Sequence, residues 1–403
     1  MKINQSDTPH KIKRIAVLGS TGSIGRQTLD VCREYPDSFR PVVLVAGSNA
    51  EELAAQALRW RPLRAVIASE EAGRRLNELL AGSGIEALCG QEAVIEAMTL
   101  PEVDTVVTAT VGYSGLAPTL AAIGAGKEIA LANKETLVVA GDLVTRRLRG
   151  SASRILPVDS EHSAIYQCLV GEDVSRVRRL IITASGGPFR TWSRQRIASA
   201  TLADALHHPN WSMGAKITVD SATMLNKAFE IIEARWLFGV EPEKIMAVVH
   251  PQSIVHSMVE FKDGSVKAQL GVPDMRGPIR YALSGATRPV TSAPGLTLEA
   301  MSQLTFEAPD TERFPGITLA HLALERGGLI PCVINAANEI AVGAFLKEQI
   351  RFTDIYPLIR EAVETFTENI ASPEYEDYVA CNTATRRRVK AMADACASTI
   401  LKP

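Results

Sequence analysis

The chain has 403 residues, of which 46% are hydrophobic and 22% charged, and its formal net charge is −2 at pH 7. At a prior of roughly 150 residues per domain this length suggests two or three domains, and the balanced charge gives no sign of a nucleic-acid-binding or disordered chain. The six cysteines form no C-x-x-C pair that would suggest a zinc ribbon, and because we find neither a signal peptide nor a run of about 18 apolar residues, we expect a cytoplasmic protein without a membrane span.

The first 160 residues alternate strand-like and helix-like patterns. Short apolar runs lie at residues 14–18, 42–46, 65–68, 105–109, 129–132 and 155–158. Helical patterns separate several of them, for example at residues 50–58 and 116–125. Continuous apolar strands that alternate with helices indicate a parallel sheet covered on both faces. We therefore predict an α/β fold that begins with a Rossmann-like domain over residues 1–160.

A glycine-rich loop follows the first predicted strand, with the spacing G-x-x-G-x-x-G over residues 19–25. Glycines let the backbone approach a pyrophosphate, and the next helix directs its positive N-terminus at it; a plain glycine turn is the alternative. The tip of the second strand, Gly47-Ser48-Asn49, lacks the carboxylate that binds the ribose of NAD. This absence leaves room for a 2′-phosphate and favours NADP, with Ser48, Asn49 and backbone amides as ligands.

Acidic residues follow the strand predicted at residues 155–158. Asp159 and Glu161 are two positions apart, which on an extended segment puts both carboxylates on one side. Adjacent acids favour a hard cation such as Mg²⁺ or Mn²⁺, and the alternative is a solvated acidic turn. The preceding strand ends at Lys134-Glu135, where Lys134 is expected near the metal and substrate or, alternatively, in a surface pair with Glu135.

From about residue 161 the composition changes to polar motifs rich in Gly, Pro, His and Trp. Strands at residues 255–261 and 266–270 around an Asp-Gly turn predict a hairpin in an antiparallel or mixed sheet. A small-residue turn places Ser185 and exposed amides where an anion can bind. Structural roles are favoured over catalytic ones for the loops at residues 250–253 and 271–276.

Residues 207–214 mix Pro, Gly and Asn with Trp211 and Met213, a composition that is not typical of regular structure. Large apolar side chains are costly to expose unless they cover something. We therefore predict a flap that closes over ligand, excludes water and brings His208 to a phosphate. A loop packed permanently on the core is the alternative.

One helix is predicted to begin with Asp220 or Ser221 as its N-cap and to continue to residue 238. Opposite its apolar stripe, a polar face is formed by Thr223, Asn226, Lys227 and Glu230. A solvated face with a Lys227–Glu230 pair is the simpler interpretation. The alternative is a binding face, on which Glu230 supplies a third carboxylate to the metal and the other side chains hold a phosphate.

The last third of the chain is predicted to be helical. Residues 291–316 are rich in Pro, Thr and Gly and are predicted to form a linker. Apolar stripes at helical spacing after residue 316 indicate a small helical bundle over residues 317–403.

Several of these segments carry distinctive short motifs. They are GSTGSIG at residues 19–25, LANKE at 131–135, PVDSEH at 157–162, SGGPFR at 185–190, HPNWSMG at 208–214, VDSATMLNK at 219–227, HPQS at 250–253, NAANE at 335–339 and RFTDI at 351–355. Together they resemble the 1-deoxy-D-xylulose 5-phosphate reductoisomerase family over nearly the whole chain. The resemblance implies an NADPH domain at residues 1–160, a catalytic and dimerisation domain with a flap at 161–290, and a C-terminal helical domain.

The implied reaction is a rearrangement of 1-deoxy-D-xylulose 5-phosphate followed by its reduction with NADPH to 2-C-methyl-D-erythritol 4-phosphate, in the non-mevalonate route to isoprenoid precursors. The implied catalytic residues are Lys134 and the metal-binding Asp159, Glu161 and Glu230. The implied ligands of the substrate phosphate are Ser185, His208, Ser221, Asn226 and Lys227. The sugar is implied to lie near Lys134, Ser160, Glu161 and Glu230, where the bound metal is Mg²⁺ or Mn²⁺.

The resemblance also implies the NADPH contacts and a homodimer. The cofactor residues are Thr21, Gly22, Ser23, Ile24, Gly47, Ser48, Asn49, Asn133, Glu135 and Gly214. One departure is Ser48, because a basic residue is expected at this position in many family members. Two rivals fit part of the pattern. A metal-independent dehydrogenase of homoserine or semialdehyde type does not explain three separated carboxylates, and a nucleotide-sensing regulator does not explain an intact catalytic set.

Overall fold

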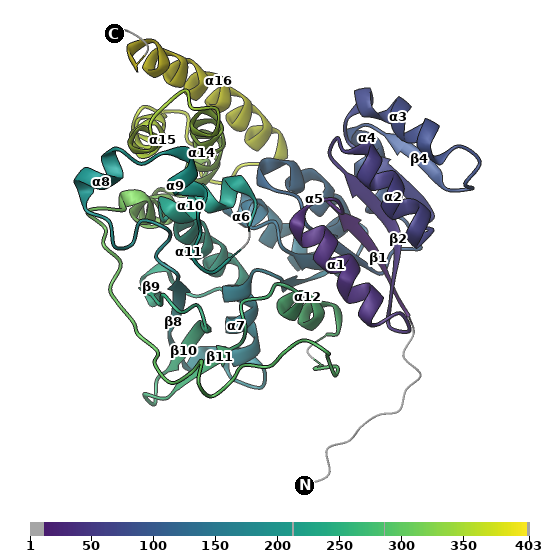
Figure 1. Ribbon diagram of the computed structural model, residues 1–403, viewed down its shortest axis with the longest axis horizontal. Coiled ribbons are helices and arrows are strands. Elements are labelled where there is room, and N and C mark those ends of the chain that lie inside the picture. Colours follow the sequence, from purple (N-terminus) through teal and green to yellow (C-terminus); the bar gives the residue numbers. More distant parts are fainter. Residues whose placement is uncertain (1–11, 212, 286, 401–403) are drawn as a thin grey trace.

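The computed structural model describes residues 12–211, 213–285 and 287–400. Its largest unit is a seven-stranded sheet with the strand order β4-β3-β2-β1-β5-β6-β7, and every neighbouring pair in it is parallel. Its strands β1, β2 and β4 are seen at the right of Figure 1. The strands are β1 (Lys13–Leu18), β2 (Phe39–Ala46), β3 (Arg64–Ile67), β4 (Glu86–Cys89), β5 (Thr105–Thr108), β6 (Glu128–Leu131) and β7 (Arg154–Pro157). The helices between them are α1 (Ser23–Glu34), α2 (Ala50–Trp60), α3 (Glu70–Leu80), α4 (Gln91–Ala97), α5 (Leu116–Gly124) and α6 (Glu135–Arg149).

Both faces of this sheet are buried, as the sequence predicts. Along β1, Ile15 and Val17 pack into one apolar cluster, whereas Ala16 and Leu18 pack into a second one. Alternate residues of a strand face opposite sides of a sheet, so both sides are covered. The predicted Rossmann-like fold is therefore confirmed.

The sequence gives no signal for the edge strand β4. Its four residues are only partly buried or exposed, because an edge strand covered on one side needs no continuous apolar run. The periodicity that marks the central strands is therefore absent.

A second, mixed sheet has the order β11-β10-β8-β9. Its strands are β8 (Val177–Ala184), β9 (Ile245–Val249), β10 (Val255–Phe261) and β11 (Val266–Leu270). Strand β10 is antiparallel to both β11 and β8, whereas β8 and β9 are parallel. The predicted hairpin is confirmed. The helices of this region are α7 (Ser160–Leu169), α8 (Arg194–Ala198), α9 (Leu202–Leu206), α10 (Ala215–Ala222), α11 (Leu225–Phe238) and α12 (Arg276–Leu283).

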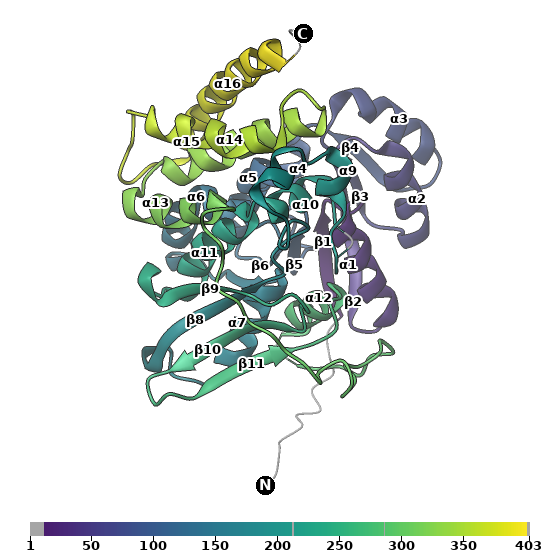
Figure 2. The same ribbon diagram turned by 60° about the vertical axis from the view of Figure 1, so that its left-hand side comes forward.

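The chain ends in the predicted group of helices. They are α13 (Leu319–Arg326), α14 (Ile330–Leu346), α15 (Ile355–Glu364) and α16 (Tyr375–Ile400). Figure 2 shows them at the opposite end of the molecule from β8, β10 and β11, with α11 between the two groups. Short 3₁₀ turns precede several elements, including η1 (Gly112–Gly115) and η4 (Pro315–Thr318).

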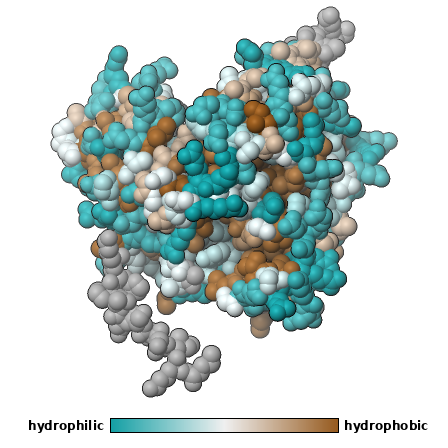
Figure 3. All heavy atoms as spheres, turned by 180° about the vertical axis from the view of Figure 1, so that it is seen from behind, coloured by the Kyte–Doolittle hydropathy of each residue, from teal (hydrophilic) through white to brown (hydrophobic). Residues whose placement is uncertain are grey.

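The surface seen from behind mixes polar residues with smaller apolar areas (Figure 3). Among the described residues, no helix is both long and apolar enough to cross a membrane.

Candidate functional site

A cavity lies where the carboxyl ends of four parallel strands meet α10 and α11. From the sheet it is lined by Ser23 after β1, Val111 after β5, Lys134 after β6 and Asp159 after β7. Open α/β sheets bind their ligands at the carboxyl ends of the strands. The fold therefore brings the glycine loop and the acidic motif, which are far apart in the sequence, to one site.

Two glycines allow α1 to begin close to the sheet. Gly19 has a φ of +93°, and a Cβ there would lie 2.7 Å from the carbonyl oxygen of Ala109. A Cβ at Gly25 would lie 2.2 Å from the carbonyl oxygen of Gly19. No side chain fits at such distances, so both glycines are required for this turn. The resulting helix N-terminus, at Gly22 and Ser23, lines the cavity and is suited to an anion.

The residues expected to contact NADPH fall into two groups. Those that line the cavity are Gly22, Ser23, Ile24, Glu135 and Gly214. Those outside its lining are Thr21, Gly47, Ser48, Asn49 and Asn133. The fully buried Asn133 donates its amide to the carbonyls of Thr110 and Gly112. It therefore stabilises the loop after β5 without lining the cavity itself.

The three predicted metal ligands converge. Asp159, Glu161 and Glu230 each offer a carboxylate oxygen, and these atoms lie within 4.8 Å of one another. The local geometry differs from the expected extended segment, because Asp159 is the N-cap of α7 and Glu161 lies in its first turn. An N-cap residue and a residue of the first helical turn lie as close together as alternate residues of a strand. The predicted proximity of Asp159 and Glu161 is therefore correct, but the predicted extended backbone is wrong.

Two buried lysines neutralise part of this negative charge. Lys134 forms ion pairs with Asp159 and with Glu230, the latter at 3.1 Å. Lys227 forms ion pairs with Glu161 at 2.9 Å and with Glu230, and it donates to the carbonyl of Thr183 at 2.6 Å. The alternative of a surface Lys134–Glu135 pair is wrong, because Lys134 is only 5% exposed and directed at the acids.

The two glutamates respond differently to this environment. Burial alone would raise the pKa of Glu161, but Lys227 and Lys134 outweigh it and lower that pKa to about 2. Burial and the neighbouring Glu161 raise the pKa of Glu230 to about 7. Of these two glutamates, Glu230 is thus the one whose charge the protein compensates less. Three converging carboxylates are the hard oxygen ligands that suit a divalent cation such as Mg²⁺, so the residues present fit a metal.

The helix that carries Glu230 is interrupted. The predicted single helix is wrong, because α10 ends at Ala222 and α11 begins at Leu225, with Met224 at a φ of +60°. Asp220 and Ser221 lie inside α10 and are not N-caps. The sequence around this break contains no glycine or proline from which it could have been predicted. Met224 adopts an uncommon conformation that tertiary contacts have to maintain.

The polar face of α11 is buried. Lys227 is 3% exposed and Glu230 is 1% exposed, so the solvated-face interpretation is wrong. Asn226 donates its amide to Glu230 Oε1 at 2.6 Å. Ser221, Asn226, Lys227 and Glu230 all line the cavity, which makes this face a candidate binding surface.

Ser185 and His208, which both line the cavity, form a hydrogen bond with each other. His208 Nε2 lies 2.9 Å from Ser185 Oγ, and its Nδ1 accepts from the backbone N–H groups of Asn210 and Trp211. Because Nδ1 accepts, the neutral ring carries its proton on Nε2 and donates it to Ser185. Burial lowers the pKa of His208 to about 4.

The segment predicted to be a flap lies against the loop between β9 and β10. Trp211 and Met213 line the cavity, and Ser212 lies outside the described residues. Asn210 donates its amide to the carbonyl of Pro251 at 2.5 Å and to Ser253 Oγ at 2.9 Å. Parts of the loops assigned structural roles also line the cavity, at Ser253 and at residues 271–276. Those loops therefore belong to the site as well as to the scaffold.

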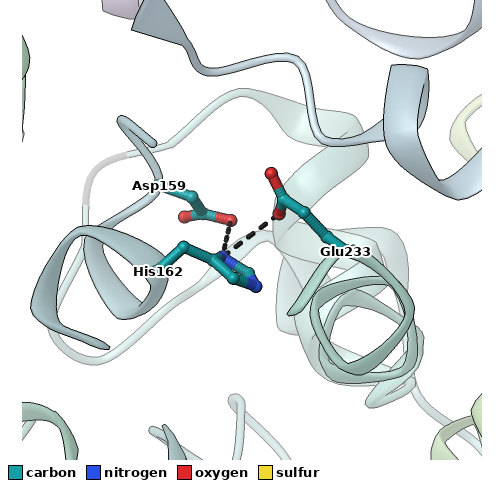
Figure 4. Close-up of side chains that lie close together, drawn as sticks. All are labelled: Asp159, His162 and Glu233. Atoms are coloured by element: carbon teal, nitrogen blue, oxygen red, sulfur yellow. Dashed lines mark ion pairs between the residues drawn. The ribbon is translucent and has the colours of Figure 1, made fainter. Parts of the chain in front are cut away.

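Sequence patterns missed two fully buried residues, His162 and Glu233, which lie beside the acids (Figure 4). His162 Nδ1 lies 3.1 Å from Glu233 Oε2 and 3.8 Å from Asp159 Oδ2, and His162 Nε2 donates to the carbonyl of Glu230 at 2.8 Å. His162 on α7 thus joins two residues of α11. The available signal was spacing, because each missed residue follows an acid by three positions, one helical turn.

The chain is similar to proteins of known name along nearly all of its length. The matching family models are described as 1-deoxy-D-xylulose 5-phosphate reductoisomerase at residues 15–141, its C-terminal domain at 155–238, and the DXP reductoisomerase C-terminal domain at 270–388. Relatives named 1-deoxy-D-xylulose 5-phosphate reductoisomerase include one from Bacteroides thetaiotaomicron, 51% identical over 95% of this chain and 98% of its own. Another, from Chloroherpeton thalassium, is 52% identical over 95% of this chain and 99% of its own.

Solved structures are similar over the same extent. The reductoisomerase from Zymomonas mobilis in complex with NADPH is 45% identical, with a TM-score of 0.88 over 95% of this chain and 100% of that one. A DOX-P reductoisomerase in complex with NADPH, fosmidomycin and magnesium is 39% identical, with a TM-score of 0.91 over 97% of this chain and 100% of that one.

Proposed function

The chain belongs to the 1-deoxy-D-xylulose 5-phosphate reductoisomerase family, and from this membership we propose how its residues divide the work of the reaction. The protein is an NADP-dependent oxidoreductase that rearranges and reduces 1-deoxy-D-xylulose 5-phosphate to 2-C-methyl-D-erythritol 4-phosphate. It uses NADPH and Mg²⁺. The observation that carries the assignment of roles is the convergence of three acids from α7 and α11 in the cavity of the glycine loop.

Asp159, Glu161 and Glu230 hold the divalent cation, for which we propose Mg²⁺ or Mn²⁺. When bound, the cation supplies Lewis-acid polarisation of substrate oxygens. Lys134 lies among the same oxygens and can donate to the sugar once it is released from Asp159. Ser160 Oγ donates to Glu161 Oε2 at 2.5 Å, which orients that carboxylate and leaves the hydroxyl at the edge of the cavity beside the sugar.

The substrate phosphate binds next to the metal site, to five residues that all line the cavity: Ser185, His208, Ser221, Asn226 and Lys227. Ser185 presents its hydroxyl as a donor, the Nε2–H of the neutral His208 can turn from Ser185 to the phosphate, and Lys227 supplies positive charge. Trp211 and Met213 cover the reacting groups as the flap closes. Phosphate binding then orients a small substrate and excludes water from the hydride transfer.

The NADPH contacts are Thr21 to Ile24 at the pyrophosphate, Gly47 to Asn49 at the adenosine end, and Asn133, Glu135 and Gly214 nearer the nicotinamide. Ser48 is exposed at the tip of β2. With no basic side chain here, the 2′-phosphate is held by hydroxyl, amide and backbone donors.

Placing a carboxylate at this tip tests the adenosine site. We expect Ser48→Asp to weaken NADPH binding by about 10-fold or more, because two like charges are brought together, while NADH binding, which involves no 2′-phosphate, changes little. Fluorescence titration with each cofactor measures both constants, with Ser48→Ala as the neutral control. An equal loss of affinity for NADPH and NADH would mean that Ser48 does not lie at the 2′-phosphate.

The division into domains at residues 1–160, 161–290, 291–316 and 317–403, the cytoplasmic location and a homodimer are further parts of the proposal. The exposed side chains of β11 and its place at the edge of the second sheet support a partner there. Light scattering of the purified chain tests the dimer, and a monomer at micromolar concentration would contradict it.

The direct test of the function is NADPH oxidation with 1-deoxy-D-xylulose 5-phosphate, with Mg²⁺, with Mn²⁺ and with EDTA. We expect turnover with either metal and none with EDTA. Activity that survives EDTA would favour a metal-independent dehydrogenase, whereas NADPH binding without turnover under any condition would favour a nucleotide sensor.

A further inference from the structure

We propose that Asn338 and Glu339, adjacent on α14, are positioning residues that fix the cofactor side of the cavity against helix α10. This inference rests on the proposed NADPH site. Both residues belong to the C-terminal helical domain and neither lines the cavity. Their role is indirect, through two sets of contacts that leave α14 in different directions.

Glu339 holds the loop after β5, whose residues Thr110 and Val111 line the cavity beside the glycine loop. Its Oε1 accepts from the backbone N–H of Tyr113 at 2.8 Å, and its Oε2 accepts from Arg386 at 2.5 Å. Gly112 has a φ of +70°, and a Cβ there would lie 2.5 Å from Glu339 Oε1. The loop is thus shaped so that its backbone meets this carboxylate.

Asn338 holds α10. Its amide donates to Asp220 Oδ1 at 2.8 Å, and both residues are fully or almost fully buried. The other oxygen of Asp220 pairs with Lys216 at 2.9 Å. Asp220 immediately precedes Ser221, a proposed phosphate ligand, and Lys216 follows the end of the flap, Gly214, by two residues. Asn338 therefore acts on the part of α10 that faces the substrate.

The two sets of contacts close into a ring. Lys216 donates to Glu135 Oε1 at 2.7 Å, and Glu135 Oε2 accepts from Asn133 at 3.1 Å. Asn133 donates in turn to the carbonyls of Thr110 and Gly112, each at 3.0 Å, which returns the chain of contacts to the loop held by Glu339. Each hydrogen bond or ion pair in this buried ring restricts how far its two partners can shift, so the ring sets the distance between the nicotinamide and the sugar.

The test separates this role from general stabilisation. In Glu339→Ala the N–H of Tyr113 loses its acceptor, so we expect the NADPH Kd to rise about 10-fold. In Glu339→Gln one oxygen can still accept that N–H, so most of the affinity should return. NADPH fluorescence titration of the full chain without substrate measures both. The control is Glu364→Gln, which breaks the exposed Arg360–Glu364 pair in the same domain and should leave the Kd unchanged.

Asn338→Ala should give the complementary result. We expect kcat/KM for 1-deoxy-D-xylulose 5-phosphate to fall about 10-fold while the NADPH Kd stays within about 2-fold. If Glu339→Ala does not fold, Arg386→Met releases the same carboxylate from its half-exposed partner and should raise the NADPH Kd about 3-fold. Control-like NADPH affinity in the folded variants at positions 339 and 386, equal losses for Ala and Gln at position 339, or an unchanged kcat/KM in Asn338→Ala would overturn the proposal. Because the titration needs no turnover, failure of the proposed reaction would be seen separately.

Discussion

Glu230→Gln is expected to reduce turnover at least about 10³-fold while NADPH affinity changes by no more than about 2-fold. The substitution keeps the size of the side chain and its bond to Asn226, but it removes one of the three negative charges. With Lys134 and Lys227 unchanged beside Asp159 and Glu161, the site loses its net attraction for a cation. The glycine loop is formed by other residues and stays intact.

Steady-state rates at several Mg²⁺ concentrations, together with NADPH titration, measure the two effects. A matched control is Glu243→Gln, an exposed acid just before β9, which should behave like the unmodified chain. Saturating Mg²⁺ should restore little of the lost activity, because the geometry of the metal also depends on this ligand. Equal losses of turnover and NADPH affinity would mean that Glu230 supports the fold rather than the metal.

Some of this architecture follows from local patterns and some does not. The central strands and the hairpin are predictable because burial on one or both faces leaves a periodic signature in the sequence, as in β1 and β10. The break between α10 and α11 at Met224 leaves no such signature in the sequence. Its left-handed backbone is enforced by the surroundings, including Gly316, where a Cβ would lie 2.5 Å from the carbonyl oxygen of Thr223. Tertiary contacts here override a continuous helical pattern.

The candidate site shows the same division. Carboxylates at a strand end and on a polar helix face made a metal site one of two alternatives, and the family resemblance then implied the set of Asp159, Glu161 and Glu230. His162 and Glu233 were not, because a histidine and a glutamate at helical spacing look like surface residues until α7 is seen against α11. For Lys134 the sequence left two alternatives, a place near the metal or a surface pair with Glu135, and the coordinates decide between them by its ion pairs with Asp159 and Glu230. Coordinates are needed to identify residues whose function depends on a contact between two elements that are far apart in the sequence.

The lysines lead to the second large effect. Lys134→Met should lower the free energy of unfolding of the metal-free protein by about 3–5 kcal/mol, because removing one partner of a buried ion pair leaves charges without compensation. In Lys134→Met the carboxylates that lose their ion-pair partner are Asp159 and Glu230. Burial keeps the pKa of Glu230, at about 7, above its ordinary value of 4.5. Its charge therefore opposes folding increasingly as the pH rises through that range, and the loss should be larger at pH 8 than at pH 6.

Bound Mg²⁺ should reverse much of this loss, because the cation and the ammonium group compete for the same oxygens. Urea unfolding of Lys134→Met at pH 8, in EDTA and in saturating Mg²⁺, should therefore show a larger metal-induced gain than the unmodified chain does. Lys267→Met, which breaks the exposed pair with Glu172, should lose at most about 1 kcal/mol and show no such difference. The same metal-induced gain in Lys134→Met as in the unmodified chain would mean that the ammonium and the metal occupy separate places, and the lysine would then have to be assigned to the substrate alone.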